Sequence, residues 1–91
     1  METYIALIER SNHKNLSNVE VQVSITDPGP GRQSWTGKFV SRSADGIIPN
    51  ERLALTFTTG QKGTGRVSET LFDSRKPDTT LVHVAGTGPL V

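Results

Sequence analysis

VEVQVSI, residues 19–25, has the clearest strand pattern of the chain. Valine or isoleucine occupies every second position, and glutamate, glutamine or serine fills the positions between them. Successive side chains of a β-strand point to opposite faces, so a period of two gives one apolar and one polar face. The stretch therefore predicts a half-buried β-strand with Val21, Val23 and Ile25 in the core.

A second clear alternation lies in the middle of the chain, where Leu53, Leu55 and Phe57 alternate mostly with threonine and other polar residues. Threonine favours strands, so we expect these three apolar side chains to join the same core. The opening segment, residues 3–9, fits either a turn of helix or a strand. Its length and the absence of an N-cap favour a strand. Further strands are expected over residues 35–40, 66–72 and 79–85.

The last of these expected strands differs from the others. Residues 79–85 carry apolar side chains at both odd and even positions, for example Leu81 and Val82. A strand that is apolar on both faces is typical of a position covered on both sides. We therefore interpret this segment as a central or doubly covered strand.

Polar connectors rich in glycine and proline separate the expected strands, and none of them exceeds about ten residues. A parallel crossover needs about a dozen residues or more and usually a helix, so neighbouring strands are expected to pair antiparallel. Closure removes the exposed edges of such a meander. The fold class is therefore all-β, a small antiparallel barrel of about six strands in meander order, with a two-sheet β-sandwich as the alternative. The connectors are residues 10–18, 27–31, 45–50, 60–65 and 73–78.

The chain has 91 residues and no cysteine, and 33% of its residues are hydrophobic. This length fits a single domain, residues 1–91, and the lack of cysteine excludes disulfides and thiolate metal sites. The first apolar run, residues 4–8, is too short for a signal peptide, and no run is long enough for a membrane helix. We expect a soluble, cytoplasmic protein with no membrane partner.

Few residues could carry catalysis. A Ser-His-acid set needs a histidine, and the two available, His13 and His83, lie in a polar connector and in a predicted strand. No close ligand pair such as His-x-His indicates a metal site. We therefore expect no enzyme activity, no cofactor and no metal. A small oligomeric enzyme with its site between subunits is kept as a second alternative.

GQKGTGR, residues 60–66, contains glycines and basic residues in the manner of a phosphate-binding loop. It lacks the Gly-Lys-Ser/Thr run that opens a helix, and a strand follows it instead. We expect a hairpin turn with a glycine at positive φ. The functional hypothesis that remains for this segment is a cationic loop that contacts an anion.

Charge is distributed unevenly along the chain. Residues 32–66 carry six basic and two acidic side chains, a net charge of +4, whereas the whole chain has a net charge of only +1. Basic residues gathered on one surface attract polyanions, and aromatic side chains can add stacking. We expect Trp35 at an exposed rim, because a large amphipathic ring often lies there. The candidate binding residues are Lys38, Arg42, Arg52, Lys62, Arg66 and Trp35.

The sequence favours a non-enzymatic binding or assembly module that presents barrel loops or an edge strand to a macromolecular partner. A protein partner or a homo-oligomer is the expected assembly. The alternative is binding of nucleic acid or another polyanion through the basic central strands. This alternative requires Lys38, Arg42, Arg52 and Arg66 to project from adjacent strands onto one outer face, which alternation allows if five side chains point inward: Trp35, Phe39, Leu53, Leu55 and Val67.

Overall fold

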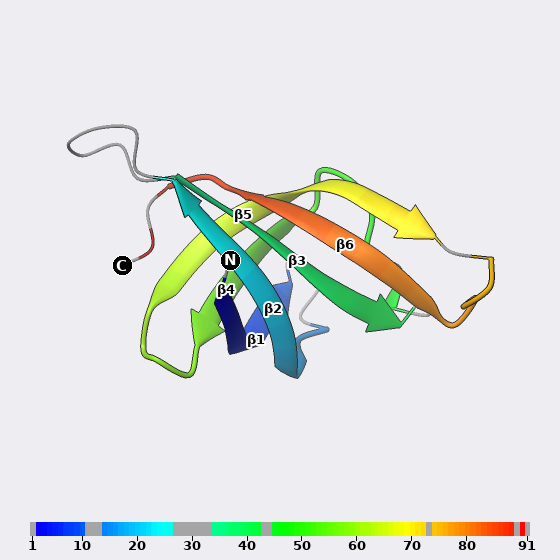
Figure 1. Ribbon diagram of the computed structural model, residues 1–91, viewed down its shortest axis with the longest axis horizontal. Coiled ribbons are helices and arrows are strands. Elements are labelled where there is room, and N and C mark those ends of the chain that lie inside the picture. Colours follow the sequence, from blue (N-terminus) through cyan, green and yellow to red (C-terminus); the bar gives the residue numbers. More distant parts are fainter. Residues whose placement is uncertain are drawn as a thin grey trace.

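In the computed structural model the described part of the chain contains six β-strands and no α-helix (Figure 1). It therefore contains no helix that could cross a membrane. The strands are β1 (Glu2–Arg10), β2 (Leu16–Thr26), β3 (Ser34–Arg42), β4 (Arg52–Phe57), β5 (Lys62–Phe72) and β6 (Thr79–Gly86). The structure describes residues 2–10, 14–26, 34–42, 45–72, 74–88 and 90.

The six strands close into a barrel in the order β1-β2-β3-β6-β5-β4, and every pair of neighbours is antiparallel. The expected small antiparallel barrel is thus confirmed. Its meander-like order consists of two three-stranded meanders, β1-β2-β3 and β4-β5-β6. The connection from β3 to β4 joins strands that are not neighbours, and it places Ile47 in the core.

Two expected boundaries need correction. The opening segment is a strand, as predicted, but the predicted loop over residues 60–65 is wrong from residue 62 onward, because β5 begins at Lys62. The predicted polar connector over residues 10–18 is also shorter, because β2 begins at Leu16. The turn does contain a glycine at positive φ, Gly60 at 93°. The predicted loop over residues 27–31 lies outside the described residues.

The core follows the predicted alternation. Val21, Val23 and their counterparts on the other strands point into the barrel, and each is at most 9% exposed. Ile25 is the exception to the prediction, because its side chain is 43% exposed. It lies near the end of β2, beyond Val23, the last β2 residue that pairs with β1, so β2 has no β1 neighbour at this position. The buried hydrophobic residues are Ala6, Ile8, Val21, Val23, Trp35, Phe39, Ile47, Leu53, Leu55, Phe57, Val67, Val82, Val84 and Leu90.

Trp35 fills one end of the barrel, so the prediction of an exposed rim position is wrong. Its side chain is 2% exposed and lies against glycines of the neighbouring strands. A Cβ atom on Gly86 would come within 2.6 Å of the indole Cδ1, and one on Gly63 within 3.2 Å of Cζ2. The glycines leave the volume that the indole occupies. Residues 60–66 therefore contain glycine for packing as well as for the turn.

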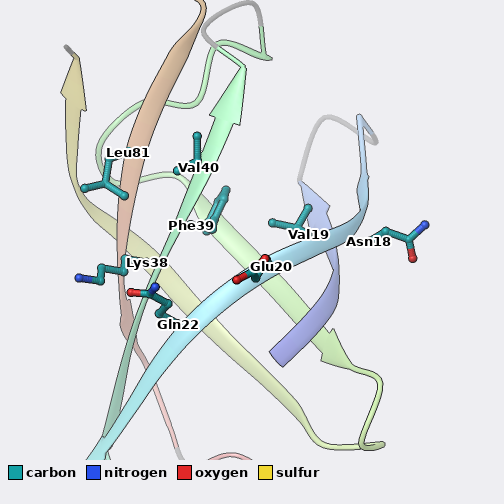
Figure 2. A pocket seen from close by; sticks show the side chains of 8 residues that line it. All are labelled: Asn18, Val19, Glu20, Gln22, Lys38, Phe39, Val40 and Leu81. Carbon is teal, nitrogen blue, oxygen red and sulfur yellow. The ribbon is translucent and has the colours of Figure 1, made fainter. Parts of the chain in front are cut away.

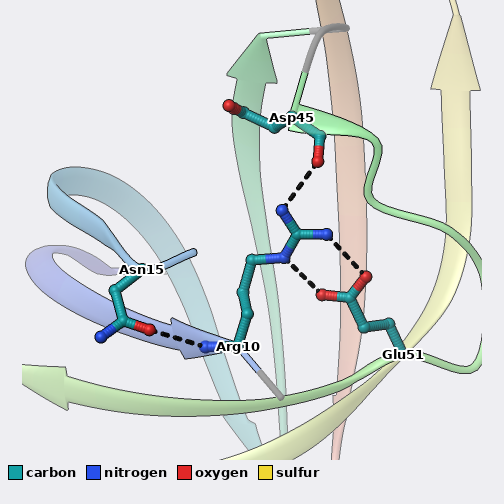
Figure 3. Close-up of polar contacts among 4 residues, drawn as sticks. All are labelled: Arg10, Asn15, Asp45 and Glu51. Atoms are coloured by element: carbon teal, nitrogen blue, oxygen red, sulfur yellow. Dashed lines mark hydrogen bonds and ion pairs between the residues drawn. The ribbon is translucent and has the colours of Figure 1, made fainter. Parts of the chain in front are cut away.

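Arg10 closes the other end of the barrel (Figure 3). Its side chain is 3% exposed and forms a bidentate pair with Glu51, with Nε to Oε2 at 2.7 Å and Nη2 to Oε1 at 2.9 Å. Nη1 donates a third hydrogen bond to the carbonyl oxygen of Asp45 at 2.7 Å. Hydrogen bonding to Glu51 raises the pKa of Arg10 above its ordinary value. These bonds tie β1 to the connection between β3 and β4.

Candidate binding face

The predicted basic side chains lie on the outside of the barrel, as alternation requires. Lys38 and Arg42 come from β3, Arg52 from β4, and Lys62 and Arg66 from β5. Their inward-pointing neighbours on the same strands, Phe39, Leu53, Leu55 and Val67, are buried. The parity argument for these strands is therefore confirmed, although it does not by itself bring the basic groups together.

The order of the strands divides the basic residues into two groups. Arg52 lies directly opposite Arg66 on the β4–β5 ladder. Lys38 and Arg42 lie on β3, which is separated from β5 by β6. Between the two groups, His83 of β6 pairs with Lys38 on one side and with Glu69 on the other. The structure thus brings Arg52 and Arg66 together and keeps them apart from the two basic residues of β3.

The Arg52–Arg66 pair is the one place where predicted cationic residues face each other across a ladder. Like charges in that position repel each other. Within the described residues neither guanidinium forms an ion pair. Glu9 of β1 and Arg52 line the same shallow pocket, whose volume is about 230 Å³. Both guanidinium groups are therefore exposed, and the carboxylate of Glu9 lies along the pocket beside Arg52.

An exposed apolar row crosses three strands on the outer face, and the prediction of binding residues missed it. Val40 of β3 pairs with Leu81 of β6, and Leu81 pairs with Leu71 of β5. Val40 is 59% exposed and Leu71 44%. We call Val40, Leu81 and Leu71 the apolar row. Phe72, 62% exposed, follows Leu71 with the opposite parity at the end of β5 and lines a hollow beside the row.

The sequence did carry one signal for this row, namely the apolar side chains on both faces of the last strand. In the structure β6 is paired with β3 and β5, and its inward Val82 and Val84 are buried. The outward Leu81 is only half-buried. The interpretation as a central strand fits these pairings, whereas the described part of the chain adds no second covering layer over Leu81.

Two hollows flank the apolar row and share Val40 and Leu81. One, of about 380 Å³, continues toward Phe72 and Lys76. The other, of about 550 Å³, lies between β2 and β3 (Figure 2). The β2–β3 register extends only as far as the pair Val21↔Phe39, beyond which the strands diverge. The apolar row therefore lies between two hollows and not on a flat surface.

A bulge explains why β2 bends away from β3. Ala6 pairs with Val19 and Ile8 with Leu16, so β2 has one more residue than β1 over this stretch. Asn18 lies within it at φ 55°, a left-handed conformation that asparagine tolerates better than most residues. A bulge increases local twist and bends its strand. The larger hollow is the result.

The described residues hold no cluster of three or more potential metal-ligating side chains. Nε2 of His83 is buried without a hydrogen-bond partner in the described structure, beside Lys38 and Ser68 in a third hollow of about 260 Å³. His13, the other histidine of the chain, lies outside the described residues.

Fold and surface together define a class, a small closed six-stranded antiparallel β-barrel with an exposed apolar row. Comparison of the chain with protein-family models, with curated proteins and with solved structures found no match. The surface of the described residues is consequently the basis for a functional proposal.

Proposed function

We propose that this protein is a non-enzymatic binding module that docks a protein partner on the outer face of β3, β6 and β5. The single observation that carries the proposal is the apolar row, which crosses three neighbouring strands and stays exposed. Burial of apolar surface contributes about 25 cal/mol per Å², so an exposed row of this kind gains most from a partner that covers it.

The outer face supports this role better than an edge strand does. Every strand of the closed barrel is paired on both sides, so backbone groups are largely used within the sheet. Other exposed apolar residues form smaller groups: Ile5 and Leu7, each 38% exposed, lie on one strand, and Ile48 lies in a connection. The apolar row is distinguished by its extent across strands and by the hollows beside it.

A photo-crosslinking amino acid at a single position tests the proposal in cells. We would place it at Leu71 in the apolar row and, as a matched control, at Thr3 on β1, which is exposed and lies opposite β6 in the ring of strands. We expect discrete protein adducts from position 71 and far fewer from position 3. Equal labelling at both positions, or none at position 71, would contradict the proposal.

Arg52 and Arg66 favour a second candidate function, binding of a phosphate-bearing polyanion. Two facing guanidinium groups without an internal ion pair can both contact phosphates, which makes binding fall with salt. The double variant Arg52→Glu with Arg66→Glu should then lose most salt-sensitive retention on a heparin column. Lys38→Glu with Arg42→Glu changes the charge equally on another part of the barrel, and equal losses for both variants would show nonspecific charge attraction only.

A further inference from the structure

We propose that the protein partner of the apolar row is a second copy of this chain, in a symmetric dimer. This inference rests on the proposed function, because it uses the same face. The dimer has a two-fold axis that lies in the interface and runs along β6. The charges that border the apolar row support this arrangement.

Charge is arranged oppositely on the two sides of β6. In the row next to Val40, Leu81 and Leu71, the outer residues are Lys38 on β3, His83 on β6 and Glu69 on β5. A cation thus lies on one side of the central strand and an anion on the other. Within the described residues no ion pair uses Lys38 or Glu69, so both charges are available to a partner.

Rotation about an axis along β6 makes this pattern match itself. Such a rotation exchanges the sides of the face, so that Lys38 of one copy faces Glu69 of the second copy, and the reverse. The same operation places Val40 opposite Leu71 of the second copy, while Leu81 meets its own equivalent at the axis. An isologous interface requires this kind of self-complementarity, and opposite charges at its border fix the register.

The area of this face limits the affinity of the dimer. Neighbouring strands are about 4.8 Å apart, so three strands give a narrow interface at the low end of the known size range, below about 1,200 Å² in total. Interfaces of that size are typical of weak association. We therefore expect a dissociation constant in the micromolar range or above, and the protein must be studied up to about 1 mM.

Sedimentation equilibrium of the purified full chain tests the dimer with charge-reversal variants. Lys38→Glu and Glu69→Lys each place like charges opposite each other twice, so each variant alone should dimerise at least about tenfold more weakly than the unmodified chain. An equimolar mixture of the two should form heterodimers within about threefold of the original affinity, because both facing pairs are then opposite in charge.

Matched controls use the same charge changes away from the face. Lys62→Glu at the start of β5 and Glu9→Lys on β1 are both at exposed positions, and they should leave the dimer unchanged. Circular dichroism of all four variants checks that the barrel is retained. If a variant at Lys38 or Glu69 fails to fold, Val40→Asp replaces it as the variant expected to dissociate the dimer.

The outcomes separate this inference from the proposed function. A chain that stays monomeric to about 1 mM, or a dimer that none of the face variants weakens, overturns the symmetric dimer. If position 71 then crosslinks to a different protein, the proposed function stands with another partner. Restoration of affinity by the mixture of variants supports the dimer, because a partner with a different surface would not show it.

Discussion

The two ends of the barrel are closed by opposite means. Because neighbouring strands are antiparallel, the start of β3 and the end of β6 meet at one end, where Trp35 packs against glycine. The end of β1 and the connection between β3 and β4 meet at the other, where Arg10 pairs with Glu51. At one end the large side chain of Trp35 fills the space left by glycines, which have no side chain. At the other end the buried charge of Arg10 is paired with Glu51.

The difference predicts different responses to mutation. At the Trp35 end a substitution should destabilise the fold when it adds volume, because packed interiors hold no spare space. At the Arg10 end a substitution should destabilise the fold when it removes one partner of the ion pair, because an unpaired buried charge costs much more than the pair contributes. Double substitutions at each end test whether volume or charge is the cause.

The largest effect is expected from Arg10→Met. This variant leaves the Glu51 carboxylate, whose side chain is 11% exposed, and the Asp45 carbonyl without their donors, at a cost of about 3 kcal/mol in the free energy of unfolding. Adding Glu51→Leu should recover a large part of that loss. Urea denaturation followed by circular dichroism measures both.

Arg42→Met is the matched control for Arg10→Met. Its guanidinium also pairs with a residue of the same connection, Asp45, but at 3.8 Å and with an Arg42 side chain that is 83% exposed. The expected loss is below about 1 kcal/mol. If the double variant at Arg10 and Glu51 loses as much as the two single variants together, charge pairing is not what closes this end.

Gly86→Ala is expected to have the next largest effect, a loss of about 2 kcal/mol. The new methyl group would come within 2.6 Å of the indole ring of Trp35, which has no room to move. Gly88→Ala is the control, since nothing lies within 4 Å of the position of its Cβ. It should change stability by less than about 0.5 kcal/mol.

A smaller side chain at position 35 should absorb the extra methyl group. In the background of Trp35→Phe, which is itself destabilising, Gly86→Ala should cost much less than it does in the original chain. This coupling distinguishes a clash with the indole from a general effect of alanine on the strand. An unchanged cost in both backgrounds would locate the effect in the backbone instead.

The smallest effect concerns Tyr4, near the start of β1. Its phenol donates a hydrogen bond to Glu2, and this bond raises the pKa of Tyr4 above 10.0. The stability it contributes is therefore complete below pH 10 and is lost as the pH rises through the folded-state pKa. Tyr4 is the single tyrosine of the chain, so tyrosinate absorbance reports it directly. Glu2→Gln should lower the pKa toward 10.0, and no change would refute the hydrogen bond.

The sequence predicted the architecture because side-chain parity depends only on local alternation. Leu53 and Leu55 on β4, like Val21 on β2, are buried where alternation expected them. Alternation does not show where a strand extends beyond its neighbour, so Ile25 was placed in the core. Alternation also carries no information on long-range packing. The prediction for Trp35 is wrong because the glycines that accommodate its indole lie on β5 and β6, far along the chain.

The candidate site was less predictable because it depends on which strands are neighbours. Arg66 and Lys38 share outward parity, but β6 separates their strands, and nothing local reveals that order. The apolar row has the same origin, since Val40, Leu81 and Leu71 come from three distant segments. Pairing of distant segments turns individually ordinary residues into one surface.

A β-bulge in β5 has a consequence for chain length. Val67 pairs with Val84 and Glu69 with His83, so Ser68 is an extra residue without a partner opposite it. Removing it would leave Val67 inward and Glu69 and Leu71 outward, whereas removing a residue from a regular stretch of β5 would exchange the two faces. Position 68 is therefore where this barrel can gain or lose a residue over evolution without altering what its surface presents.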